Sequence, residues 1–210
     1  MLNWRDVLKT YPAGALDAPT LVLAHGAGAG QAHPWMTRVA KGLAARGVSV
    51  VTFDFPYIEA RRRAPDRPAV LEKTFQDVWR TVASDTKGRL FAGGKSMGGR
   101  IASQVAARHG FDPPPGGLIF FGYPLHPPGR PTARRDRHLP SIDVPMLFFH
   151  GGRDGFGSPQ EMRELVATLP DARLDLVDDA DHSLIRPKRA DPRGQSIDQV
   201  LDAAAAWITR

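Results

Sequence analysis

The stretch Gly94-Lys95-Ser96-Met97-Gly98-Gly99 decides how this chain of 210 residues is interpreted. It reads G-x-S-x-G, with the run Arg89-Leu90-Phe91-Ala92-Gly93 before it and a helix-like segment at 100–108 after it. Such a strand, sharp turn and helix hold the central serine clear of a sheet, at a helix N-terminus where negative charge is stabilised. Glycines two residues before and two after the serine keep side chains from colliding across the turn.

Outside this turn, short apolar runs alternate with segments of helical periodicity. Residues 1–19 are poorly patterned, and Trp4, Val7, Leu8 and Tyr11 are compatible with an edge strand or a short packing segment. The alternation predicts an α/β fold in one domain over 1–210, with a mostly parallel sheet of about six strands and helices on both faces. The expected strands are 20–24, 48–53, 90–93, 117–121, 145–150 and an edge strand at 173–177. The expected helices are 34–46, 68–86, 97–109, 158–169 and 196–209.

Composition narrows the class of protein. Hydrophobic residues make up 42% and charged residues 24%, as in ordinary globular proteins. There is no cysteine, which excludes disulfides, cysteine-based zinc sites and a cysteine nucleophile. The formal charge is +6, but much of the excess lies in two basic segments, 61–67 and 130–137, that lack interleaved aromatic residues. We interpret them as solvated loops and expect no nucleic-acid partner.

The start of the chain, residues 1–6, lacks the basic and apolar regions of a signal peptide. No window approaches the roughly 18 uncharged apolar residues of a membrane-spanning helix. A cytoplasmic location without a membrane partner is therefore expected.

Ligands of parallel sheets bind beyond the carboxyl ends of the strands, so partners of Ser96 are expected in the loops after predicted strands. A serine nucleophile needs a base and a third group that orients the base. His182 follows the last predicted strand, and Asp154 follows the strand 145–150. The order Ser96, Asp154, His182 is an order that a catalytic triad adopts. Asp143 is the alternative acid but precedes its strand, and Asp181 is too close in sequence to orient the ring of His182.

Two backbone N–H groups are candidates for an oxyanion hole. Met97 follows the nucleophile directly, and Ala27 lies in the glycine-rich loop 26–30 after the first predicted strand. This chemistry needs neither a cofactor nor a metal.

The other histidines have different expected roles. His25 and His150 end predicted strands and are expected to buttress their loops. His33 and His109 are expected to be structural or exposed, and His138 is a further candidate for contact with substrate.

Five residues are candidate substrate contacts. Arg62 and Arg135 lie in the basic segments, both of which follow predicted strands, and Lys95 precedes the nucleophile. Arginine pairs well with carboxylate and phosphate, so a small acyl substrate with a negative charge is expected. Tyr57 and His126, in motifs described below, complete the set.

Other interpretations of the glycine-rich segments are weaker. Gly94-Lys95-Ser96 would end a phosphate-binding loop only if residue 89 were glycine, and it is Arg89. The run 26–30 is not a dinucleotide fingerprint, because the third glycine would fall at Gln31 or His33. A hydrolase-like scaffold that binds a protein or nucleic acid without catalysis is the remaining alternative.

Over nearly its whole length the chain resembles a small α/β-hydrolase. The motifs DFPY at 54–57, APDR at 64–67 and GYPLHPPG at 122–129 are similar to a branch near the dienelactone hydrolases. That branch includes a testis-expressed mammalian protein and a scaffold subunit of a chromatin acetyltransferase complex. The resemblance implies an α/β-hydrolase fold with little or no lid. Dienelactone hydrolases use cysteine where this chain has Ser96, so their substrate is not carried over.

The predicted function is therefore that of a carboxylesterase-like serine hydrolase. It would cleave a small acyl ester, or a related carboxylic-acid derivative, through an acyl-enzyme intermediate at Ser96.

Overall fold

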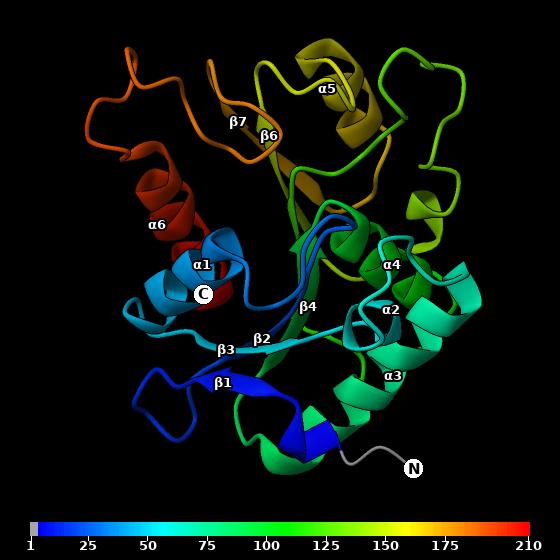
Figure 1. The fold of residues 1–210 in the computed structure, drawn as a ribbon, viewed down its shortest axis with the longest axis vertical. Coiled ribbons are helices and arrows are strands. Elements are labelled where there is room, and N and C mark those ends of the chain that lie inside the picture. Colours follow the sequence, from blue (N-terminus) through cyan, green and yellow to red (C-terminus); the bar gives the residue numbers. More distant parts are fainter. Residues whose placement is uncertain (1–3) are drawn as a thin grey trace.

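A seven-stranded sheet forms the centre of the computed structural model, which describes residues 4–210 (Figure 1). Its strand order is β1-β3-β2-β4-β5-β6-β7, and β1 pairs antiparallel with β3 while every other neighbouring pair is parallel. The strands are β1 (Lys9–Tyr11), β2 (Thr20–Ala24), β3 (Ser49–Phe53), β4 (Leu90–Lys95), β5 (Leu118–Phe121), β6 (Met146–Gly151) and β7 (Ala172–Val177).

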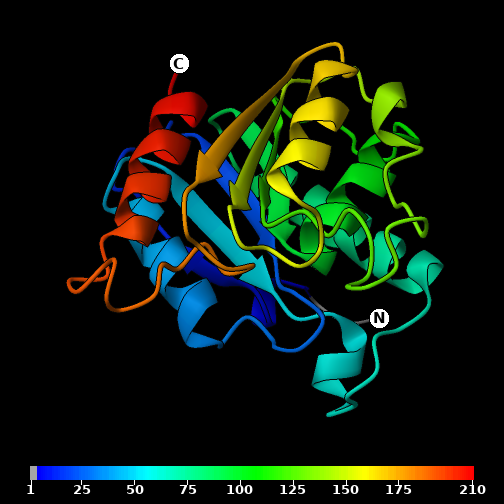
Figure 2. The ribbon, with the colours of Figure 1, turned by 90° about the horizontal axis from the view of Figure 1, so that it is seen from above.

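Helices cover both faces of this sheet, as the view from above shows (Figure 2). Helices α1 and α6 pack against each other on one face, and α3 and α4 pack together on the other, where α5 also lies. The helices are α1 (Pro34–Ala44), α2 (Pro56–Glu59), α3 (Pro68–Asp85), α4 (Met97–Ala106), α5 (Pro159–Ala167) and α6 (Ser196–Ile208), with 3-10 turns at Trp4–Asp6 and Leu139–Ser141.

Burial on both faces explains the continuous apolar runs of the central strands. Every residue of β2, β5 and β6 is buried. In β5, Phe120 joins the core beside α3 and α4, whereas its neighbour Phe121 joins the core beside α1 and α6. Adjacent residues of a strand point to opposite faces, so a strand covered on both faces must be apolar throughout.

The α/β-hydrolase fold expected from the sequence is confirmed, with local differences. The seventh strand is β1, and three residues are too few to show an alternating pattern. The short helix α2 lies inside the predicted loop 54–67, because four residues are too few to show a helical period. Helix α4 ends at Ala106 rather than 109, and His109 has φ 49°, a left-handed conformation that a helix cannot continue through.

Two further predictions concern a signal peptide at the start of the chain and membrane-spanning helices. Residues 1–3, part of the segment in which no signal peptide was expected, lie outside the described residues. Within residues 4–210, no helix is long and apolar enough to cross a membrane.

Candidate active site

The candidate nucleophile sits on a strained turn between β4 and α4. Ser96 has φ 50° and ψ −115°, a backbone conformation that residues with a side chain rarely adopt. A Cβ at Gly94 would lie 2.5 Å from the backbone carbon of Gly98, and a Cβ at Gly98 would collide with the carbonyl oxygen of Ala24. Both glycines are therefore needed for the turn to pack against β2 and to hold Ser96 at the first turn of α4.

A series of hydrogen bonds joins the three residues of the predicted triad. His182 Nε2 lies 2.8 Å from Ser96 Oγ, and His182 Nδ1 lies 2.7 Å from Asp154 Oδ2. A carboxylate only accepts, so Nδ1–H donates to Asp154, which leaves Nε2 to accept the serine proton. Burial alone would raise the pKa of Asp154, but the hydrogen bonds from His182 and from the Phe156 N–H outweigh it and hold that pKa below its usual range. This arrangement can accept a proton from Ser96 and stabilise the resulting imidazolium.

The two other acids considered from the sequence lie in different surroundings. Asp143 is exposed and lies 3.9 Å from His109, remote from this series of contacts. Asp181 Oδ1 accepts from the N–H groups of Ser183 and Ile185, at 2.8 and 3.1 Å. Asp181 therefore shapes the turn that carries His182 and does not contact its ring.

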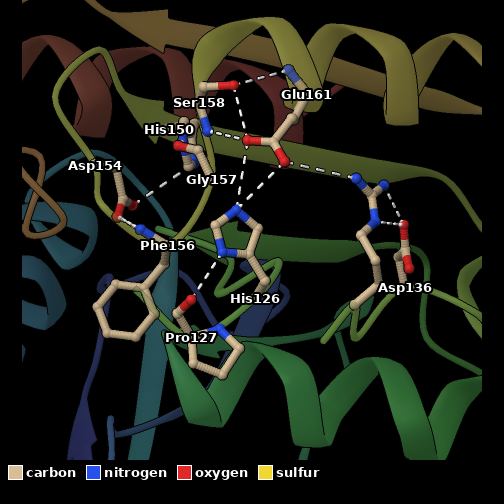
Figure 3. A network of polar contacts seen from close by, with 10 residues as sticks. His126, Pro127, Asp136, His150, Asp154, Phe156, Gly157, Ser158 and Glu161 are labelled. Carbon is tan, nitrogen blue, oxygen red and sulfur yellow. Dashed lines mark hydrogen bonds and ion pairs between the residues drawn. The ribbon is translucent and has the colours of Figure 1, made fainter. Parts of the chain in front are cut away.

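The loop that carries Asp154 is held by its own contacts (Figure 3). The N–H of Phe156 donates to Asp154 Oδ1 over 2.8 Å, and the Phe156 ring lies 4.3 Å from the His182 ring, centroid to centroid. His150, fully buried at the end of β6, is bonded through Nε2 to the carbonyl of Gly157 over 2.8 Å. Burial lowers the pKa of His150 and favours its neutral form, so Nε2–H is the donor. The ring thus ties β6 to the far end of the loop, as expected for a buttress.

A second loop presents the N–H of Ala27. Tyr57 Oη donates to the Ala27 carbonyl over 2.9 Å, and His25 Nδ1 is bonded to the Gly26 carbonyl over 2.8 Å. His25 Nε2 in turn accepts from the N–H of Phe55 over 3.0 Å, so both carbonyls are tied to the segment after β3. Within residues 4–210, neither the Ala27 N–H nor the Met97 N–H donates to a protein acceptor. Ala27 lines the cavity described next, whereas Met97 is buried and is not among its lining residues.

A cavity of about 370 Å³ opens beside Ser96. Of the predicted substrate contacts, Lys95 lines it; Trp35 and Phe156 form apolar walls. Lys95 Nζ donates to the carbonyl of His182 and lies 5.7 Å from the centre of the Trp35 ring. The full lining comprises Gly26, Ala27, Gly28, Ala29, His33, Trp35, Met36, Lys95, Ser96, Phe156, His182 and Ser183.

Five predicted substrate contacts lie outside this cavity. His138 is bonded through Nε2 to Ser103 Oγ on α4 over 2.7 Å. Tyr57 is fully buried beneath the Ala27 loop. Arg62 pairs with Asp66 on the surface, four residues further on.

The other two belong to the segment after β5. His126 is buried and bonded to the Pro127 carbonyl and, over 3.4 Å, to Glu161 (Figure 3). The Arg135 backbone bonds to Leu125 and to the hydroxyl of Tyr123. None of these residues is among those that line the cavity.

Eight of the twelve lining residues were not predicted as site residues, and three of these eight carry ring side chains. Trp35 lies in the expected helix 34–46, and its Nε1–H donates to the Ser183 carbonyl over 2.9 Å beside the cavity. His33 was expected to be structural or exposed. Phe156 could have been considered from the sequence, because it is an aromatic residue between Gly155 and Gly157, two residues after the predicted Asp154.

Comparison with known proteins identifies related folds. A family model described as "Alpha/beta hydrolase domain" matches residues 17–209. An alpha-beta serine hydrolase homologue from Coxiella burnetii superposes with a TM-score of 0.73 at 18% identity, covering 94% of this chain and 90% of that one. Est1E from Butyrivibrio proteoclasticus, solved with ferulic acid, gives 0.74 at 12% identity, covering 96% and 95%. Dienelactone hydrolase from Anabaena variabilis gives 0.70 at 20% identity, covering 96% and 91%. At these identities the structural likeness concerns the fold.

Proposed function

Because this chain belongs to the alpha/beta hydrolase family, we propose that it is a serine hydrolase that cleaves small acyl esters. The observation that carries the proposal is the hydrogen-bonded series Ser96–His182–Asp154 at the edge of a cavity. The cavity volume of about 370 Å³ is at the small end of the range for ligand sites, which favours a small substrate.

The proposed reaction proceeds in two acyl-transfer steps. His182 Nε2 takes the Ser96 proton as Ser96 Oγ attacks the ester carbonyl, and the N–H groups of Ala27 and Met97 hold the oxyanion. His182 then gives the proton to the leaving alcohol, and the acyl group stays on Ser96. A water molecule, deprotonated by His182, attacks the acyl-enzyme, and the acid leaves as Ser96 regains its proton. Each oxyanion donor is expected to contribute about 3 kcal/mol of transition-state stabilisation.

Fluorophosphonate labelling followed by intact mass measurement tests this function. Wild-type protein is expected to gain one adduct, and Ser96→Ala is expected to gain none. Ser103→Ala is a matched control, because Ser103 is a buried serine of α4 bonded to His138 and the Arg100 carbonyl. No adduct on folded wild-type protein would overturn the proposal and favour a non-catalytic scaffold.

A further inference from the structure

The ammonium group of Lys95 is the one cationic lysine or arginine group among the residues that line the cavity. The side chain is partly buried and lies between the walls formed by Trp35 and the His182 turn. No aspartate or glutamate is among the lining residues. Within residues 4–210, Lys95 Nζ makes one hydrogen bond, to the His182 carbonyl, although an ammonium group has three donors.

A desolvated ammonium with unused donors is a costly group unless an anion approaches it. Burial lowers the pKa of Lys95 to about 8. Electrostatic attraction to the carboxylates of Asp154 and Asp181 raises this pKa but only partly offsets the lowering by burial. Asp154 is bonded to His182 and Phe156, and Asp181 to two backbone N–H groups, so neither is free to pair with Lys95. A neutral ligand would leave the ammonium without a partner in the cavity.

We propose that Lys95 is the carboxylate-recognition group of this cavity, so that the substrate is an ester that also carries a carboxylate. The proposal deepens the serine hydrolase function above and rests on it. Lys95 precedes Ser96, and both line the cavity, so a carboxylate on Lys95 would lie close to the reacting ester. The predicted arginines do not share this role, because Arg62 and Arg135 do not line the cavity.

Matched esters test the proposal. The first pair is p-nitrophenyl pentanoate and p-nitrophenyl hemiglutarate, which differ by a terminal methyl against a carboxylate on the acyl side. The second pair is phenyl pentanoate and 4-carboxyphenyl pentanoate, with the carboxylate on the alcohol side. Wild-type kcat/KM is expected to favour the anionic member of at least one pair. Lys95→Met is expected to lower that preference on the order of 10- to 100-fold, and Lys95→Arg is expected to retain part of it.

The pH dependence and two control variants test whether the preference for the anionic ester depends on the charge of Lys95. The preference should decline as the pH rises through about 8, because Lys95 loses its proton, and Lys95→Met should show no such decline. Arg62→Ala and Arg135→Ala should keep the wild-type preference. Absence of any preference in wild-type protein would overturn the proposal. So would an equal loss on both members of each pair in Lys95→Met, which would confine Lys95 to holding the His182 carbonyl.

A binding measurement separates this proposal from the proposed function. Methyl hemiglutarate and methyl pentanoate are titrated by NMR into Ser96→Ala and into Ser96→Ala/Lys95→Met. Tighter binding of the hemiester that disappears with Lys95→Met supports recognition of a carboxylate, and equal binding overturns it. If wild-type protein neither labels nor hydrolyses any ester, the hydrolase function fails and these titrations alone decide the role of Lys95.

Discussion

Asp154 accepts one hydrogen bond from the ring of His182 and one from the backbone N–H of Phe156, and the two hydrogen bonds have different effects. The bond from His182 Nδ1 selects the tautomer of the proposed base, and the bond from the Phe156 N–H holds the carboxylate in place. The side chain of Asp154 is fully buried, so water cannot replace either partner.

Replacing this carboxylate tests the orienting role. Asp154→Asn is expected to lower kcat by roughly 10⁴-fold, because an amide can donate to Nδ1 and so favour the wrong tautomer of His182. Asp143→Asn is the matched control and is expected to leave kcat unchanged, since Asp143 is exposed and distant from His182. Steady-state hydrolysis of a p-nitrophenyl ester measures both, and a similar small effect of the two changes would contradict the assignment.

Two buried tyrosines make the same kind of contact in different places. The hydroxyl of Tyr57 donates to the carbonyl of Ala27, and the hydroxyl of Tyr123 donates to the carbonyl of Arg135. Burial raises the pKa of Tyr57 to about 12, so it stays a donor at neutral pH.

The same substitution at the two tyrosines separates an effect on stability from an effect on kcat. Tyr57→Phe and Tyr123→Phe should each lower the free energy of unfolding by about 0.5–1.5 kcal/mol, because each removes a partly buried hydrogen bond to a backbone carbonyl. Only Tyr57→Phe should also lower kcat, by about tenfold, since only that carbonyl belongs to the loop that presents the Ala27 N–H. Urea unfolding and ester hydrolysis measure the two effects, and equal kcat values would argue against this role of Tyr57.

At the scale of elements, helix α5 fixes the end of the loop that carries Asp154. Its N-terminus has a capping box, in which Ser158 Oγ accepts from the Glu161 N–H and Glu161 Oε2 accepts from the Ser158 N–H. The backbone N–H of Ser158, and then its hydroxyl, lower the pKa of Glu161 to about 2. Gly157, which His150 binds, directly precedes this cap.

Loss of the cap should destabilise the protein without abolishing the site. Ser158→Ala is expected to lower the free energy of unfolding by about 1 kcal/mol. A Glu161 pKa below its unfolded value contributes stability above about pH 4.5, and this contribution is lost as the pH falls toward about 2. The difference between Ser158→Ala and wild type should therefore narrow as the pH falls from about 4.5 toward about 2. Ser84→Ala, at an exposed position within α3, is the matched control and should change stability by less than about 0.5 kcal/mol.

At the scale of the molecule, one sheet separates two hydrophobic cores. The strands contribute side chains to both cores, so neither core can form without the sheet. We propose that the chain unfolds as one cooperative domain for this reason.

Neighbouring residues of β5 test that cooperativity. Phe120→Ala and Phe121→Ala each open a cavity in a different core, and each should cost about 3–5 kcal/mol. Both variants should nevertheless unfold in a single transition, with tryptophan fluorescence and far-UV circular dichroism coinciding. A variant in which the two signals separate would show that the cores unfold independently.

Much of the fold and the chemistry of the site could be predicted from the sequence, because both depend on local patterns. Apolar runs identified the central strands, since a strand covered on both faces admits few polar residues. The glycines at 94 and 98 predicted the turn that holds Ser96, because no larger residue fits there. The parallel arrangement brings the carboxyl ends of β4, β6 and β7 to one edge. The residues that follow them, Ser96, Asp154 and His182, were therefore expected to meet, and they lie within hydrogen-bonding distance. Their catalytic role stays a prediction.

Which side chains reach the cavity depends on the tertiary structure. Arg62 and Arg135 lie in segments that follow strands, but their contacts hold them away from it. Trp35 and Phe156 enter the cavity because α1 and the Asp154 loop pack beside the His182 turn. The direction of a side chain in a loop depends on partners far away in the sequence, and a local sequence pattern does not predict those partners. The periodicity of a strand or helix depends on its own residues, so the central strands and the turn at Ser96 could be predicted from the sequence, whereas the short strand β1 and the walls of the site could not.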